Sequence, residues 1–469
     1  SVSLACGLAK ARDLKGGHEN IIAVIGDGSL SGGEAYEGLS NAGEMGTNLI
    51  IVVNDNEMSI AENHGGLYQN LKELRDTEGR SSCNFFRSLG LDYLYVGEGN
   101  DIPSLIAAFA KVKDTSRPTV VHIHTQKGKG YAPAEADREE FHWEMPFDLE
   151  TGKPKVDCSG MEDYHSLTGK FLLEKMKEDH TVVAISSGTP TVIGFTPERR
   201  KQAGRQFVDV GIAEEHAVAL ASGIAAGGGR PVYGVYSTFV QRCYDQLSQD
   251  LCINGNPAVI TVFMGTVAGM NDVTHLGFFD IPLISNIPNM VYLAPTCSEE
   301  YFAMLEWAVR QTEYPVAIRV PGAAVVHRKE EFDTDYSELN RYKMTARGET
   351  VAILALGSFY DLGQALKNKL REESGVEATL INPRYITGLD EPMLEELKVG
   401  HRIVVTLEDG VLDGGFGEKI ARYYGNSEMR VLNYGLRKEF ADRYNLDELM
   451  KANRLTDKQM AEDIAGILG

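Results

Sequence analysis

Helical patterns alternate along the chain with short, nearly continuous apolar runs. In the first third of the chain, these runs occupy residues 21–26, 48–55 and 118–125. Short runs rich in β-branched residues are typical of strands that are buried on both faces of a parallel sheet. The pattern predicts an α/β module, in which ligands bind beyond the carboxyl ends of the strands.

Two further blocks repeat this alternation. Their apolar runs lie at 181–187, 230–237, 257–265, 290–295, 315–322, 350–357, 376–382 and 402–409. Residues 131–162 are polar and interrupted by prolines, which indicates a surface linker. We therefore expect an α/β protein with three open parallel-sheet domains, over residues 1–155, 160–335 and 340–469. The first residues read as a helix that has already begun, so we expect the true N-terminus to lie upstream.

The composition of the chain argues against some kinds of binding partner. The chain has 46 basic and 67 acidic residues, a formal net charge of −21, which repels nucleic acids and acidic membranes. No run of about 18 apolar residues is present, so we expect neither a nucleic-acid nor a membrane partner. The six cysteines are scattered without a CxxC pair, which favours reduced thiols in a cytoplasmic protein over disulfides or a zinc site.

Residues with metal- and phosphate-binding chemistry follow the first two predicted strands. Asp27 lies between two glycines after the first strand, and Asn56 follows the second. Glycine at position 28 lets a phosphate approach the backbone, and the helix start that follows favours negative charge. The Asp27 carboxylate, the Asn56 amide and a backbone carbonyl at Met58 are oxygen ligands that suit Mg²⁺. Gly-Asp-Gly alone also forms ordinary turns. The prediction of a metal and phosphate site therefore depends on Asp27 and Asn56 following two successive strands.

The segment GDGSLSGGEAYEGLSNAGEMGTNLIIVVNDNEMSIAEN resembles the 1-deoxy-D-xylulose-5-phosphate synthase family of transketolase-like enzymes. Similarity continues in KGKGYAPAE, VDVGIAEEHAVALASGIA, YSTFVQRCYDQ, THLGFFD and LEDGVLDGGFGEKI, and covers essentially the whole chain. The resemblance implies thiamine diphosphate and Mg²⁺ as cofactors, small-molecule 2-oxo acid and aldehyde substrates, and a homodimer. It also implies that the first domain holds the diphosphate and the second the aminopyrimidine.

The resemblance further assigns individual residues. The catalytic set is Glu214, His275, Arg242 and Tyr236; the cofactor set is Asp27, Gly28, Ser29, Asn56, Met58, Lys127, Tyr131, Glu214 and Phe239; the metal set is Asp27, Asn56 and Met58. In the family, the glutamate hydrogen-bonds the pyrimidine N1′, and burial of such a carboxylate raises its pKa. From the residues alone, other interpretations stay open: a structural ion pair of Arg242 with Asp245, a structural His275, and a core Phe239.

The sequence departs from the family on the acceptor side. The family's Asp-Arg-Ala-Gly is Phe-Met-Gly-Thr at 263–266, and its Tyr-Pro-Arg-Gly is Val-Pro-Gly-Ala at 320–323. Two arginines that hold the acceptor phosphate in the family are thus Met264 and Gly322, although Arg319 is retained. Each charge-assisted contact is worth roughly 1.5–3 kcal/mol, so both losses would weaken a phosphorylated acceptor by about 10²- to 10⁴-fold.

Three hypotheses follow from this pattern. The first is an enzyme that decarboxylates pyruvate or a similar 2-oxo acid and transfers the two-carbon unit to an aldehyde other than glyceraldehyde 3-phosphate. The second is the ordinary synthase, which uses that phosphorylated aldehyde. The third is a non-catalytic regulatory protein that binds the cofactor, which the intact set of Asp27, Asn56 and Glu214 disfavours. A nicotinamide dehydrogenase is excluded because no GxGxxG follows the first strand.

Overall fold

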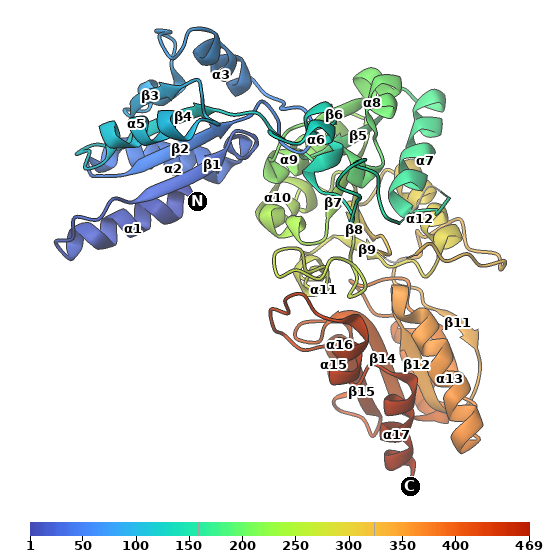
Figure 1. The fold of residues 1–469 in the computed structure, drawn as a ribbon. Coiled ribbons are helices and arrows are strands. Elements are labelled where there is room, and N and C mark those ends of the chain that lie inside the picture. Colours follow the sequence, from blue (N-terminus) through green and yellow to red (C-terminus); the bar gives the residue numbers. More distant parts are fainter. Residues whose placement is uncertain (157–159, 323) are drawn as a thin grey trace. The chain divides into compact units, whose positions relative to one another are not determined.

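The computed structural model describes residues 1–156, 160–322 and 324–469, within which three β-sheets form (Figure 1). The chain divides into two compact units. Unit 1 comprises residues 1–161 with the short segments 186–190 and 209–214, and unit 2 comprises the remainder. Each unit is described by itself below.

The sheet of unit 1 is parallel throughout, in the strand order β1-β2-β4-β3. Its strands are β1 (Ile22–Gly26), β2 (Ile50–Asp55), β3 (Asp92–Val96) and β4 (Thr119–His124). Its main helices are α1 (Val2–Leu14), α2 (Gly33–Met45), α3 (Leu67–Asp76), α4 (Phe85–Ser88) and α5 (Ile102–Val112). Residues of α1 to α4 pack in one apolar cluster against β1, β2 and β4, whereas α5 packs against the other face of β2 and β4.

Strand β1 differs from the expectation that every strand is buried on both faces. Its side chains alternate between buried and exposed, and Ile22 and Val24 are 52% and 62% exposed. The prediction was wrong for this strand because β1 lies at the edge of the sheet and α5 packs on β2 and β4 instead. The predicted helix at the start of the chain is confirmed as α1.

The second sheet has the strand order β6-β5-β7-β8-β10-β9. Its strands are β5 (Val182–Ser186), β6 (Phe207–Asp209), β7 (Arg230–Tyr236), β8 (Val259–Phe263), β9 (Val291–Leu293) and β10 (Val316–Arg319). The associated helices are α7 (Tyr164–Glu178), α8 (Pro197–Ala203), α9 (Glu214–Ala226), α10 (Tyr244–Gln246), α11 (Asp280–Ser285) and α12 (Ser298–Arg310). Residues of α7 and α12 pack against β5, β7, β8, β9 and β10 in one apolar cluster.

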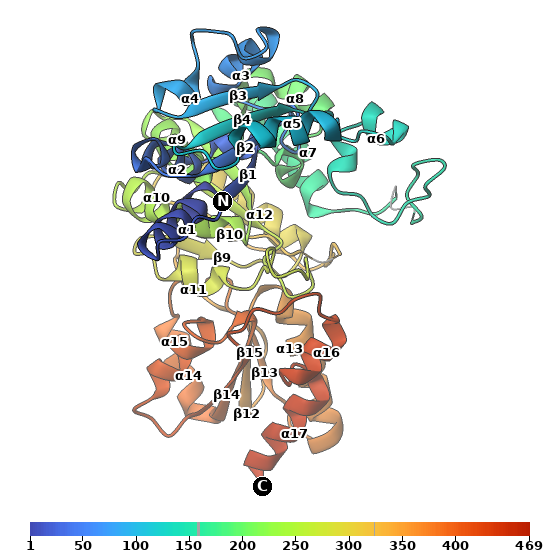
Figure 2. The same cartoon turned by 60° about the vertical axis from the view of Figure 1, so that its left-hand side comes forward.

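The third sheet has the order β11-β13-β12-β14-β15. Its strands are β11 (Lys343–Ala346), β12 (Thr350–Ala355), β13 (Thr379–Asn382), β14 (His401–Val411) and β15 (Arg430–Leu436). Helices α13 (Tyr360–Ser374) and α17 (Asp457–Leu468) lie on one face and α14 (Glu391–Gly400) and α15 (Phe416–Tyr424) on the other, with α16 (Leu446–Ala452) beside α17 (Figure 2). Strand β11 pairs antiparallel with β13, so the expectation of a purely parallel sheet was wrong at this edge.

The predicted α/β class is therefore confirmed. The predicted linker at 131–162 contains the short helix α6 (Ala132–Ala136), and its residues 157–159, with Cys158, lie outside the described residues. In the described residues, no disulfide involves Cys6, Cys83, Cys243, Cys252 or Cys297. In the described parts of the chain, no helix is both long and apolar enough to cross a membrane.

Candidate active site

Asp27 and Asn56 meet at the carboxyl edge of the first sheet. Parallel pairing of β1 with β2 places Gly26 opposite Asn54, so both loops leave the sheet side by side. The backbone N–H of Asp27 donates to the Asn54 carbonyl at 3.0 Å, and the Asn63 side-chain amide donates to Asp27 Oδ2 at 2.6 Å. The predicted juxtaposition of the two loops is present.

The Asp27 carboxyl is 1% exposed. Burial, together with the nearby negative charge of Asp55, raises its pKa from 3.8 to about 6, although the hydrogen bond from Asn63 opposes the rise. A buried carboxylate that is costly to ionise is a site at which a cation would be favourable. Asp55, the other buried carboxylate described at this edge, is instead paired with basic side chains.

Asp55 is fully buried and paired with two basic side chains. Arg75 of α3 donates to Asp55 Oδ2, and His122 Nε2 of β4 lies 2.9 Å from the same oxygen. Although burial disfavours the ionised form, the bond to His122 and the charge of Arg75 keep the pKa of Asp55 below its ordinary value. Tyr93 lies 2.7 Å from His122 Nδ1, so both ring nitrogens of His122 have partners inside the protein. Asp55 therefore has a structural role at this edge of the sheet, and the Asp27 carboxylate remains available to bind a ligand.

The loop after β2 approaches Gly28 closely. A Cβ atom at position 28 would lie 2.6 Å from the Ser59 Cβ, so any larger residue would displace this loop. Within the loop, Asn56 Oδ1 accepts from the Met58 N–H at 3.2 Å, and Glu57 has a positive φ of 68°. The turn therefore holds Asn56 and Met58 next to the Asp27 loop, as the metal hypothesis requires.

Lys127 and Tyr131 follow β4. The Lys127 ammonium donates to the Ser59 carbonyl at 2.6 Å, so it braces the loop that also contacts Gly28. Burial lowers the pKa of Lys127, and the negative charge of Asp27 opposes that shift. The buried Tyr131 hydroxyl has no hydrogen-bond partner among the described residues. Ser29 is exposed in the short 3₁₀ turn after Asp27.

Glu214 is the first residue of α9, and it is 2% exposed. A buried carboxylate at a helix start can hold a proton-bearing ring nitrogen, which is the role that the family resemblance implies. Its neighbour Glu215 is partly exposed and lies 3.6 Å from Arg242. The structure therefore distinguishes the two adjacent glutamates, and Glu214 is the buried one.

Three predicted site residues form a row of rings in unit 2. Tyr236 ends β7, and its ring lies 5.8 Å from that of Phe239, which in turn lies 5.5 Å from that of His275. His275 Nδ1 lies 2.9 Å from Asp272 Oδ1, and the bonds from Thr274 and His275 lower the pKa of Asp272 to about 2. The row places His275 beside Phe239, from which it is distant in the sequence, and Asp272 orients the His275 imidazole.

Arg242 also lies in this part of the chain. Its guanidinium is one third exposed and forms an ion pair with Glu215 at 3.6 Å. Glu215 is thus an ion-pair partner of Arg242, and the alternative that pairs Arg242 with Asp245 stays a prediction. An ion pair of this length in contact with solvent is weak, so a substrate carboxylate could compete for Arg242.

Met264 and Gly322, which replace the two family arginines, pack against each other. A Cβ atom at position 322 would lie 3.0 Å from the Met264 Cα and 2.4 Å from Thr266 Cγ2. Met264 has a positive φ of 56°. Ala323, the last residue of that motif, lies outside the described residues. Two positions that carry charge in the family are therefore joined here by a close uncharged contact.

The retained Arg319 is fully engaged inside the protein. It is 4% exposed, and its Nε donates to Asp280 Oδ2 at 2.7 Å while Nη2 donates to the Asp409 carbonyl at 2.6 Å. Tyr292 also donates to Asp280. This buried network holds the guanidinium in place, so the retained arginine has a structural role.

The residues at the first sheet edge fit a bound metal and diphosphate. Asn63 Oδ1 is buried without a hydrogen-bond partner in the described chain, directly beside the Asp27 carboxylate. One carboxylate, one amide and one carbonyl form an oxygen donor set of the kind Mg²⁺ prefers. Among the described residues there is no cluster of three or more His, Cys, Asp or Glu that could hold a metal ion. Sequence reasoning missed the roles of Arg75 and of Asn63, although Asn63 ends the first segment that resembles the family.

Family models match three stretches of the chain. Residues 1–84 match the model described as 1-deoxy-D-xylulose-5-phosphate synthase. Residues 162–325 match the transketolase pyrimidine binding domain, and residues 341–460 match the transketolase C-terminal domain.

Curated relatives extend the similarity along the chain. A 1-deoxy-D-xylulose-5-phosphate synthase from Clostridium tetani is 34% identical over 507 aligned residues, covering 100% of this chain and 81% of that relative. One from Geobacter sulfurreducens is 35% identical, with 94% and 75% covered. Among solved structures, a Pichia stipitis transketolase in complex with xylulose 5-phosphate has a TM-score of 0.55 at 17% identity and covers 99% of this chain. That last likeness shows the fold alone.

Proposed function

The chain belongs to the 1-deoxy-D-xylulose-5-phosphate synthase family, and from this premise we propose that it decarboxylates pyruvate or a similar 2-oxo acid and transfers the two-carbon unit to an aldehyde. The family consists of transketolase-like transferases that use thiamine diphosphate. The observation that carries the proposal is the pair of joined strand ends, where the backbone N–H of the buried Asp27 donates to the Asn54 carbonyl at 3.0 Å.

In this proposal, the first sheet edge binds Mg²⁺ and the diphosphate. Asp27, Asn56 and the Met58 carbonyl would hold the metal, while Gly28 keeps the backbone accessible to phosphate oxygens. Lys127 braces the loop and adds positive charge. Thiamine diphosphate, when bound, supplies the carbanion chemistry for two-carbon transfer.

The second group of residues would act on the pyrimidine and the substrates. Glu214 would hold a proton at pyrimidine N1′, because its burial favours sharing of that proton, and Phe239 would pack against the ring. Arg242 would bind the carboxylate of the 2-oxo acid, a charge-assisted contact. His275, oriented by Asp272, would transfer a proton at the acceptor carbonyl, with Tyr236 beside it.

Two measurements test the proposed reaction. Isothermal titration of thiamine diphosphate should show tight binding with Mg²⁺ and weak binding with a chelator. Release of ¹⁴CO₂ from [1-¹⁴C]pyruvate, with an aldehyde present, should show turnover. Cofactor binding without release from pyruvate or other 2-oxo acids would instead favour the non-catalytic alternative.

The acceptor is the second element of the proposal. Family membership favours glyceraldehyde 3-phosphate, whereas the uncharged contact between Met264 and Gly322 favours an aldehyde without this phosphate. The buried ion pair of Arg319 leaves that residue unable to substitute. We propose that the acceptor of this enzyme differs from that of the family. Its kcat/KM should then differ little between phosphorylated and plain aldehydes.

The test compares kcat/KM for glyceraldehyde 3-phosphate and for glyceraldehyde. The kcat/KM for glyceraldehyde 3-phosphate divided by that for glyceraldehyde should be about 10²- to 10⁴-fold lower than the same ratio in a relative with both arginines. Met264→Arg should raise the ratio about tenfold or more, while Met264→Gln, a matched uncharged variant, should leave it unchanged. A ratio in the unmodified protein equal to that of the relative would establish the ordinary synthase instead.

The remaining family expectations are also proposals. We propose a cytoplasmic homodimer with domains over 1–155, 160–335 and 340–469. The free thiols support a reducing compartment, and the exposed apolar residues of β1 give unit 1 an uncovered surface. Light scattering after size exclusion should give twice the chain mass of 51.4 kDa; a mass of 51.4 kDa would exclude the dimer.

A further inference from the structure

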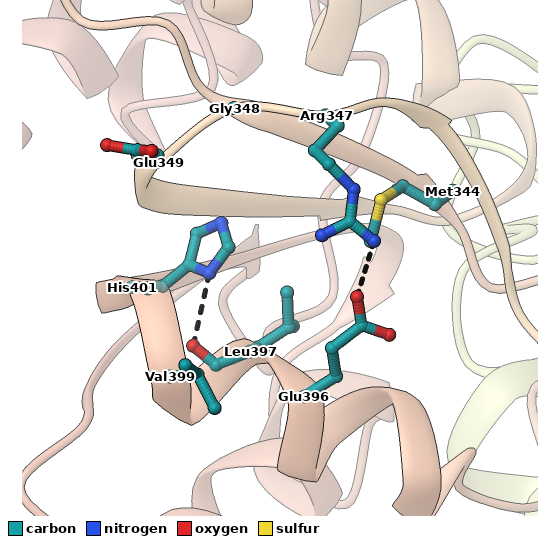
Figure 3. Close-up of a pocket in the computed structure, with 9 residues that line it drawn as sticks. Met344, Arg347, Gly348, Glu349, Glu396, Leu397, Val399 and His401 are labelled. Carbon is teal, nitrogen blue, oxygen red and sulfur yellow. Dashed lines mark hydrogen bonds and ion pairs between the residues drawn. The ribbon is translucent and has the colours of Figure 1, made fainter.

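Two cavities in the C-terminal part of unit 2 differ in whether their basic side chains have ion-pair or hydrogen-bond partners within the protein. The first, of about 490 Å³, lies between β11 and α14 (Figure 3). Its Arg347 is ion-paired with Glu396, and His401 is bonded to the Leu397 carbonyl at 3.1 Å and to Thr379 Oγ1 at 2.8 Å. Its basic groups are therefore occupied by the protein itself.

The second cavity, of about 340 Å³, carries two basic groups that are not occupied in this way, Lys329 and Lys367. Its basic side chains are Arg328, Lys329 and Lys367, and its one carboxylate is Glu330. No ion pair or hydrogen bond of the Lys329 or Lys367 ammonium is found in the described chain. An excess of positive charge in a protein of net charge −21 is a local feature that selects anions.

Arg328 is the fixed element of this cavity. Its guanidinium stacks 4.9 Å from the centroid of the Tyr360 ring and is ion-paired with Asp361, and its side chain is 16% exposed. The Nε atom is buried without a hydrogen-bond partner among the described residues. A buried charged donor without an acceptor is costly, and a bound anion would supply the acceptor.

Helix α13 supplies the opposite wall. Tyr360, Gln364 and Lys367 follow one another at four- and three-residue spacing and so share a face of the helix. The Tyr360 hydroxyl donates to Thr345 Oγ1, and Arg328 covers the Tyr360 ring, so no aromatic face is left for a nucleobase. The Gln364 amide, in contrast, is exposed and without a partner in the described residues.

We propose that this cavity binds a small phosphate monoester with a hydroxylated carbon chain. The phosphate would contact Arg328 Nε and the two lysines, since guanidinium and ammonium groups both bind phosphate oxygens, and the Gln364 amide would bind a hydroxyl. The volume lies at the lower end of the roughly 300–1,000 Å³ range of small-molecule sites. All the residues involved belong to 328–380, so the site does not depend on the proposed reaction.

The test uses the full chain loaded with thiamine diphosphate and Mg²⁺, titrated calorimetrically with glycerol 3-phosphate. Lys367→Gln and Lys329→Gln should each weaken binding about tenfold or more. Lys369→Gln is the matched control: it removes the same charge from α13, at a residue whose partners are Glu373 and Asp457. It should leave the affinity unchanged.

Further arms identify the ligand chemistry. Inorganic phosphate should bind more weakly than glycerol 3-phosphate, and malonate more weakly still. Absence of saturable binding would overturn the proposal, as would equal affinity in Lys367→Gln and Lys369→Gln, which would indicate binding elsewhere in the enzyme. Binding of malonate as tight as that of glycerol 3-phosphate would overturn the assignment to phosphate esters. Failure of pyruvate turnover would not change any of these outcomes, so the two proposals are tested separately.

Discussion

Replacement of Asp27 by asparagine should stabilise the cofactor-free protein at neutral pH. Burial raises the pKa of Asp27 from 3.8 to about 6. At 1.36 kcal/mol for each pH unit, this difference corresponds to about 3 kcal/mol of unfolding free energy lost on ionisation. Asparagine avoids that cost, and its amide can be accommodated because the Asn63 Oδ1 beside it lacks a partner.

The sign of the pH dependence follows from proton binding. Because the pKa of Asp27 is raised on folding, the folded protein holds more protons than the unfolded chain between about pH 4 and pH 6. Its stability therefore falls as pH rises through this window. Asp27→Asn should match the unmodified protein below pH 4 and exceed it by up to about 3 kcal/mol above pH 6, or roughly 2–4 °C of melting temperature per kcal/mol.

The assay is thermal unfolding of the apo protein from pH 4 to 8, repeated with Mg²⁺ and thiamine diphosphate. Ligand at a hundred times its Kd should stabilise the unmodified protein by about 2.7 kcal/mol, and Asp27→Asn should lose this gain. Asp55→Asn is the matched control, since it breaks the buried pairs with Arg75 and His122 and should destabilise by about 3–5 kcal/mol. The reasoning is refuted if apo Asp27→Asn melts below the unmodified protein at pH 7.5, or if it keeps the cofactor-induced shift.

Three further substitutions test other parts of the site. Glu214→Gln should lower ¹⁴CO₂ release by about 10²- to 10⁴-fold while calorimetry still detects cofactor binding; near-normal release would remove Glu214 from the catalytic set. Arg319→Met should lower the unfolding free energy in urea by about 3–5 kcal/mol, because it leaves Asp280 charged and buried; a change below 1 kcal/mol would contradict the buried network. Gly277→Ala should destabilise by about 1–3 kcal/mol in the same assay, because its Cβ would lie 1.8 Å from the Met264 carbonyl oxygen. Gly223→Ala in α9, which meets nothing within 4 Å, is its control and should be neutral or stabilising.

The strands that could be predicted are those whose side chains are nearly all apolar. Each predicted apolar run contains a strand, including β2, β8 and β12. Strands β3, β6, β11 and β15 were not predicted, because they are short or only partly buried and resemble loops in hydropathy. Their place is determined by pairing with a neighbouring strand rather than by their own composition.

Within the candidate site, the sequence predicted neighbours along adjacent strands and missed contacts made by loops and helices. Asp27 and Asn56 follow paired strands, so their proximity follows from the topology. Asn63 reaches Asp27 from a loop, and Arg75 reaches Asp55 from α3, and neither contact is encoded in a spacing. Only the folded chain shows that basic side chains neutralise Asp55, whereas the Asp27 carboxylate remains available to bind a ligand.

The acceptor side shows why a retained residue is weaker evidence than its surroundings. Arg319 is present in sequence, yet its hydrogen bonds end on Asp280 and on the Asp409 and Gly277 carbonyls. A guanidinium with these partners cannot turn to a substrate phosphate without leaving Asp280 charged and unpaired in the interior, which is strongly unfavourable. At Gly322 the obstacle is steric, since even a Cβ atom would contact Thr266 at 2.4 Å. Under the proposed change of acceptor, positive charge at Met264 would restore a phosphate contact, whereas positive charge at Gly322 would do so only if the Thr266 loop also moved.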